Sequence, residues 1–253
     1  MPPAVPAPSP DRVVVPVDGT RSSARSLSLA SRLAEWLESE LVIVSVIDDF
    51  RTEAPARMAW LDDLLGDLPT SVERRIVQAR SVATTIAEES ADGLVCIATT
   101  AEPFDADGIR HTVTDGLVAA SASPVVVVGP ECPADAGIDR VVVAIDPDHE
   151  QDGLATWATW LAYHLRVPLE FVHVADADPP DLGPKVRSLV PADGESVADR
   201  LVAEADGGLL AMGSHGRTGF HRLVSGSVGA AVIPHATSPV LILGPNAAPP
   251  RAR

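Results

Sequence analysis

Lysine is almost missing from this chain. Of its 19 basic residues only Lys185 is a lysine, while acidic residues number 35, so the formal net charge is −16. Non-specific binding of nucleic acid needs a basic face, and this charge balance opposes it. An acidic, lysine-poor surface suits a very salty cytoplasm, where net charge maintains solubility despite screening. We therefore expect a salt-adapted host, although a GC-rich genome would also favour arginine over lysine.

Cysteine and long apolar runs are also scarce. Cys96 and Cys132 are the only thiols, and they provide neither a disulfide framework nor a metal-binding spacing. No apolar run approaches the roughly 20 residues of a membrane-spanning helix, and no signal-peptide pattern is visible. These absences predict a cytoplasmic protein without a membrane partner, in a reducing compartment.

What the chain does contain is an internal repeat. Residues 11–15 (Asp-Arg-Val-Val-Val) recur as 139–143, and residues 96–130 align without a gap with 211–245, both ending in Gly-Pro. A duplicated unit of about 110–130 residues fits the usual size of a domain. The predicted organisation is a flexible tail (1–10), a first domain (11–130), a linker (131–138), a second domain (139–245) and a tail (246–253).

Strand-like and helix-like patterns alternate along both copies, which predicts an α/β fold with parallel sheets covered on both faces. Residues 177–184 are rich in proline, so the second helix of the second copy should be mostly missing. The expected strands are 13–17, 41–47, 72–77, 94–98, 125–128, 141–145, 169–174, 186–189, 209–212 and 240–243. The expected helices are 27–37, 54–65, 82–90, 109–120, 152–165, 195–205 and 227–235.

One stretch of the second copy combines a short apolar strand, a glycine-rich loop and the start of a helix. Its glycines have the spacing Gly213-x2-Gly216-x9-Gly226-Ser227. This geometry presents backbone N–H groups and a helix N-terminus to an anion. A Walker A lysine is absent, so the loop is no P-loop. The competing interpretation is a turn that needs glycine for positive φ and binds nothing.

This glycine spacing and the sequence Gly-Ser-His-Gly-Arg-Thr-Gly (213–219) resemble the nucleotide-binding motif of the universal stress protein family. The resemblance implies two tandem doubly wound parallel sheets, each with strand order 3-2-1-4-5. It also implies that the two copies pair through their last strands as an intramolecular pseudo-dimer. Ligands of such sheets bind at the carboxyl ends of the strands where the order reverses, here between strands 1 and 4.

The same resemblance implies a site for ATP, ADP or AMP in the second copy, assisted by Mg²⁺. Asp146 would contact adenine or ribose. Taken alone, this residue would be better explained by an Asx turn or a helix cap, but the glycine loop opposite favours the ligand contact. Arg217 would add positive charge. The other implied ligand-binding residues are Val174 and Met212 against the base, and Gly213, Gly216, Gly226, Ser227 and Val228 around the phosphates.

The first copy departs from the pattern. Asp18 retains the strand-1 aspartate, but Gly213, Gly216 and Arg217 fall on Ala98, Ala101 and Glu102. Gly226-Ser227 falls on His111-Thr112, and the loop gains Asp105 and Asp107. Carboxylates repel a polyphosphate, and Cβ atoms crowd its place. We therefore expect one nucleotide per chain, in the second copy.

Two further functions remain open: a ligand-free interaction module, and an ATP-cleaving enzyme, which would need a domain for an acceptor substrate. No residue is placed as a general base and no lysine is available, so any ATP hydrolysis should be slow. Adjacent Ser214 and His215 cannot form a hydrolase triad with Asp146. His173 is expected to be packed in the core. Protein partners and a further homodimer are left open.

Overall fold

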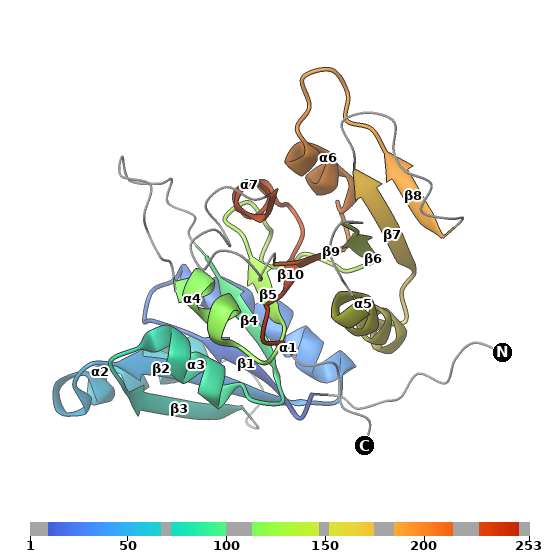
Figure 1. Cartoon of the computed structure of the whole chain (residues 1–253). Helices are drawn as coiled ribbons and strands as arrows, with labels where there is room; N and C mark the ends of the chain where they lie inside the picture. Colours follow the sequence, from blue (N-terminus) through green and yellow to red (C-terminus); the bar gives the residue numbers. More distant parts are fainter. Residues whose placement is uncertain are drawn as a thin grey trace.

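The computed structural model describes residues 10–66, 72–99, 113–146, 152–174, 185–214 and 228–247 (Figure 1). Its strands lie within a residue or two of the expected ranges. Those of the first half are β1 (Arg12–Pro16), β2 (Glu40–Ile47), β3 (Glu73–Gln78), β4 (Leu94–Ala98) and β5 (Val125–Val128). Those of the second half are β6 (Val141–Ala144), β7 (Leu169–Val174), β8 (Val186–Leu189), β9 (Leu209–Gly213) and β10 (Val240–Leu243).

All of these strands join one ten-stranded sheet, with the order β3-β2-β1-β4-β5-β10-β9-β6-β7-β8. Within each half the strands are parallel, and the predicted order 3-2-1-4-5 is confirmed twice. The halves meet where β5 and β10 pair antiparallel, with Val126 opposite Leu241. The expected pairing through the last strands is therefore present, and it makes one sheet of the two.

Helices cover both faces of this sheet. One face carries the core to which α1 (Leu27–Trp36), α2 (Phe50–Leu64) and α5 (Asp152–Leu165) contribute. The other carries the core of α3 (Val82–Glu89), α4 (Val113–Ala120), α6 (Val197–Glu204) and α7 (Val228–His235). No helix in the described part of the chain is both long and apolar enough to cross a membrane.

The central strands are buried on both faces, which explains why they are continuous apolar runs. All four valines of β5 are at most 1% exposed. The edge strands β3 and β8 instead carry ion-paired arginines. Arg75 lies 2.7 Å from both Glu73 and Glu89, and Arg187 pairs with Glu170 at 2.8 Å. Charged side chains on an edge disfavour pairing with another chain.

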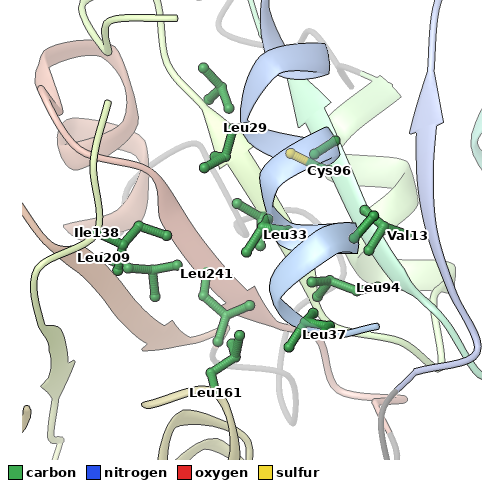
Figure 2. Packing of buried hydrophobic residues seen from close by; sticks show 14 of the residues in the cluster. Val13, Leu29, Leu33, Leu37, Leu94, Cys96, Ile138, Leu161, Leu209 and Leu241 are labelled. Carbon is green, nitrogen blue, oxygen red and sulfur yellow. The ribbon is translucent and has the colours of Figure 1, made fainter. Parts of the chain in front are cut away.

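The apolar core under α1 and α5 runs without interruption from one half into the other (Figure 2). Leu33 and Leu37 of the first half belong to the same buried cluster as Leu161, Leu209 and Leu241 of the second. The opposite core is shared in the same way. Because both cores cross the β5–β10 seam, the two halves are stabilised by the same burial of apolar surface.

Two glycines let the halves approach closely at the seam. A Cβ at Gly129 would lie 2.2 Å from the carbonyl oxygen of Ile233, and one at Gly244 would lie 2.0 Å from that of Val118. Gly129 and Val118 stand at the positions in the first copy that Gly244 and Ile233 occupy in the second. The contact is therefore reciprocal, as in an isologous interface.

The segment between the halves is held by two arginines. Arg25 donates from Nη2 to the carbonyl oxygens of Pro130 (2.8 Å) and Cys132 (2.7 Å). Arg32 donates to those of Asp135 and Ala136. Charge-assisted bonds of this kind are stronger than neutral ones, so the predicted linker is bound to the first half. On the other side, Asn246, predicted to lie in the C-terminal tail, donates to the carbonyl of Ala119 at 2.7 Å.

Two helix starts differ from the expected ranges because capping residues define them. Helix α2 begins at Phe50 rather than at residue 54, since the Asp49 carboxylate accepts from the Arg51 N–H (2.9 Å). Helix α6 begins at Val197 rather than at 195, since Ser196 and Asp199 form a capping box. The expected starts of the helices at 109 and 227, and the proline-rich segment 177–184, lie outside the described residues.

Both cysteines are free and buried in the core under α1. Burial raises the pKa of the Cys96 thiol above its usual range and that of Cys132 to about 11. Since the thiolate is the reactive form, both thiols are expected to be unreactive at neutral pH.

Replacement of Gly129 or Gly244 by alanine should destabilise the chain by about 1–3 kcal/mol, because the new methyl group would meet a backbone carbonyl that cannot rotate away. Urea unfolding measures the loss. Gly137→Ala is the control, since no described atom lies within 4 Å of a Cβ built there. Equal stability of all three variants would contradict the close approach at the seam.

Candidate functional site

The carboxyl ends of three neighbouring parallel strands form the candidate site. In the sheet, β6 lies between β9 and β7. The register pairs Ala144 with Val172, so Asp146, two residues beyond β6, and Val174, the last residue of β7, follow at the same end of the two strands. Gly213 ends β9 on the other side of β6. The structure thus brings Asp146, Val174 and Gly213 to one edge of the sheet, where the strand order reverses.

Apolar side chains lie on one face at this edge. Met212 is 8% exposed and belongs to the core under α6 and α7, while Val174 and Val228 pack against that core. Val228 begins α7, which returns from the end of β9 to the start of β10. Its N-terminus therefore lies at the same end of the sheet as Gly213.

Two structural reasons for a glycine, a positive φ and a close contact at the place of the Cβ, do not apply to Gly213 among the described residues. The described glycines with positive φ are Gly19, Gly194 and Gly207, so Gly213 does not need glycine for its backbone conformation. A Cβ at Gly213 would also find no described atom within 4 Å, whereas one at Gly208 would lie 2.8 Å from the Arg140 carbonyl. Among the described residues, the space beside Gly213 is open.

The remaining predicted phosphate-binding residues, Gly216, Arg217, Gly226 and Ser227, lie outside the described residues. The same holds for Ala101, Glu102, Asp105, Asp107 and His111-Thr112 of the first half. The site is therefore described by its strand ends, by Asp146, which is half-buried, and by the start of α7.

Ser214 is held by the end of β10. Its backbone N–H and its hydroxyl both donate to the carbonyl oxygen of Leu243, at 2.9 and 3.0 Å. A hydroxyl bound in this way is oriented toward the backbone and not toward a catalytic base, which agrees with the exclusion of a Ser-His-Asp triad. In the part of the chain that the structure describes, no three His, Cys, Asp or Glu side chains form a metal site.

His173 is a residue of this site whose role the sequence did not reveal. It is half-buried on β7 and not enclosed in the core as expected. Its Nδ1 lies 3.0 Å from the carbonyl oxygen of Ile145, the residue before Asp146. Because a carbonyl only accepts, Nδ1 carries the proton. The repeat contains the signal: at the aligned position of the first half, the Ser45 hydroxyl donates to the Val17 carbonyl at 2.7 Å.

The first half uses its strand-1 aspartate differently. Both the backbone N–H and the hydroxyl of Thr20 donate to Oδ1 of Asp18, at 2.9 and 2.7 Å. Burial acts to raise the pKa of Asp18, but hydrogen bonds with Thr20 and Ser23 outweigh it, so the pKa is lowered. The Asx turn that was the alternative interpretation of such an aspartate is present here.

Solved structures with a similar fold cover nearly the whole chain. A functionally unknown protein of Pseudomonas aeruginosa PAO1 is 17% identical, with a TM-score of 0.64 and 93% of each chain covered. A universal stress protein of Archaeoglobus fulgidus DSM 4304 is 16% identical, with a TM-score of 0.68, covering 92% of this chain and 96% of that one. At these identities the likeness concerns the fold.

The sequence itself is informative in the second half. The model of the universal stress protein family matches residues 185–244, from the start of β8 to the end of β10. No curated protein matches the chain significantly. The family match thus lies in the second half of a fold that repeats the same strand order twice and that is similar to the fold of a solved universal stress protein.

Proposed function

We propose that the chain is a nucleotide-responsive binding module that holds one adenine nucleotide, ATP or its di- or monophosphate, in its second half. The observation that supports this most is at Gly213, where a Cβ would meet no described atom within 4 Å, at the same end of the sheet as Val174 and the end of β6 that leads to Asp146. A glycine that neither its φ nor its described neighbours require is expected where a ligand approaches the backbone. Asp146 would accept from the adenine amino group or from a ribose hydroxyl.

The charge of the chain determines how phosphates would be held. With a net charge of −16 and one lysine, binding must rely on backbone N–H groups, on the start of α7 and on Arg217. A counter-cation such as Mg²⁺ or K⁺ would offset the carboxylates of 147–151, which include Asp148 and Glu150. Measurements belong at high salt as well as low, since adaptation to salt stays a prediction.

A binding function is favoured over an enzymatic one. Turnover of ATP needs a group that positions water or an acceptor, and the hydroxyl of Ser214, which follows Gly213, is bound to the Leu243 carbonyl. Phosphate release at many turnovers per minute would contradict this assignment. The competing function, a ligand-free interaction module, predicts no effect of any nucleotide on stability.

Calorimetric titration with ATP, ADP and AMP, with and without Mg²⁺, tests the proposal. One equivalent per chain is expected, because only the second half keeps the open glycine. Two equivalents, or none for all three nucleotides, would refute it. Mass spectrometry of the freshly purified, denatured protein would identify a nucleotide that co-purifies.

Gly213→Val should weaken nucleotide binding at least tenfold, about 1.4 kcal/mol, because the side chain would fill the open space at the strand end. Unfolding without ligand should change little, since valine suits a strand and meets no described atom. Titration of the variant measures the affinity, with Ala98→Gly, the reverse change at the aligned position of the first half, as the control. Undiminished affinity of Gly213→Val would exclude this edge as the site.

His173→Val should also weaken nucleotide binding, because it removes the hydrogen bond that fixes the Ile145 carbonyl next to Asp146. His173→Ser should restore part of the affinity, since Ser45 makes the same bond in the first half. The loss in stability should be about 1 kcal/mol for valine and smaller for serine. If both variants bind like the parent, the backbone bond does not position Asp146.

A further inference from the structure

The strand end of the first half is occupied by a side chain of the protein itself. We call the group formed by Val17, Asp18, Gly19 and Ser45 the first strand-end site. Arg57, half-buried on α2, reaches across to it. Its Nη1 donates to the hydroxyl of Ser45 and lies 3.5 Å from the Val17 carbonyl oxygen. One cation therefore bridges the ends of strands 1 and 2.

The backbone is shaped to admit this guanidinium. Gly19 has φ of +91°, a conformation that side chains with a Cβ rarely adopt. A Cβ at Gly19 would lie 3.0 Å from both Cζ and Nε of Arg57. The guanidinium is thus packed against the peptide of Gly19, and glycine is required there for the turn and for the close approach.

The hydrogen-bond acceptors at this site already accept from groups of the protein itself. The Ser45 hydroxyl donates to Val17 and accepts from Arg57, and Oδ1 of Asp18 accepts twice from Thr20. In the second half His173 stands at the position of Ser45 and reaches the Ile145 carbonyl directly. There the segment that follows β7, 175–184, lies outside the described residues, and 177–184 is the stretch predicted to lose its helix.

We propose that Arg57 is a built-in occupant of the first strand-end site: its guanidinium takes, from within, the position at which a ligand would approach the ends of β1 and β2. The site is selective for a planar cation that donates to Val17 and Ser45 while lying close to Gly19. This half is thereby kept in a filled state that does not depend on ligand concentration. The inference does not depend on nucleotide binding in the second half.

Chemical rescue tests the proposal. Arg57→Ala should unfold at a lower temperature than the parent chain, and guanidinium chloride at about 20 mM should raise its melting temperature by about 2 °C by binding in the emptied place. At this concentration the denaturing effect of guanidinium is small. Sodium chloride at the same concentration controls for ionic strength. Arg57→Met, which keeps an apolar stem without the cation, should be rescued in the same way and serves if the alanine variant does not fold.

The matched control is Arg51→Ala, which removes an exposed arginine from the same helix. Neither this variant nor the parent should gain from guanidinium. Equal responses of all chains, or no rescue of either Arg57 variant, would overturn the proposal. Titration of Arg57→Ala with ATP separates the two hypotheses: a chain that shows guanidinium rescue but binds no nucleotide contradicts only the function proposed for the second half.

Discussion

The rest of the structure depends on the antiparallel pairing of β5 with β10. It turns two five-stranded sheets into one, and it lets each apolar core continue from one half into the other. The pairing is possible because Gly129 and Gly244 admit the carbonyls of the opposite helices to contact distance. Burial of apolar surface across the seam is the dominant favourable term, and the glycines provide the geometry that this burial needs.

On this common frame the two strand ends have become chemically different. In the second half, a Cβ at Gly213 would meet no described atom within 4 Å, and Asp146 follows β6, the strand between β7 and β9. In the first half, Asp18 closes an Asx turn and Arg57 covers Gly19. The same strand order thus carries different side-chain contacts at the strand ends of the two halves. Function follows from the site and not from the fold.

Much of the fold could be predicted from the sequence, because strands that are buried on both faces consist of continuous apolar runs such as Val125–Val128. The repeat and the glycine spacing of 213–227 pointed to the candidate site, which stays a prediction because 215–227 lie outside the described residues. The predicted helix starts were less accurate, although the residues of the capping box, Ser196 and Asp199, can be recognised in the sequence. Arg57 could not be foreseen, since its contact with Val17 depends on how α2 packs and not on any local pattern.

Covalent fusion of the two copies has an evolutionary consequence. In a homodimer every substitution appears on both sides of the two-fold axis, so a change that fills one ligand position fills both. Here each copy mutates separately, while the seam between them persists at any dilution because the partner is tethered. The first half could therefore acquire internal contacts such as that of Arg57 while the second half kept different residues at its own strand end. Fusion thus lets the two strand ends differ while both halves still build one sheet.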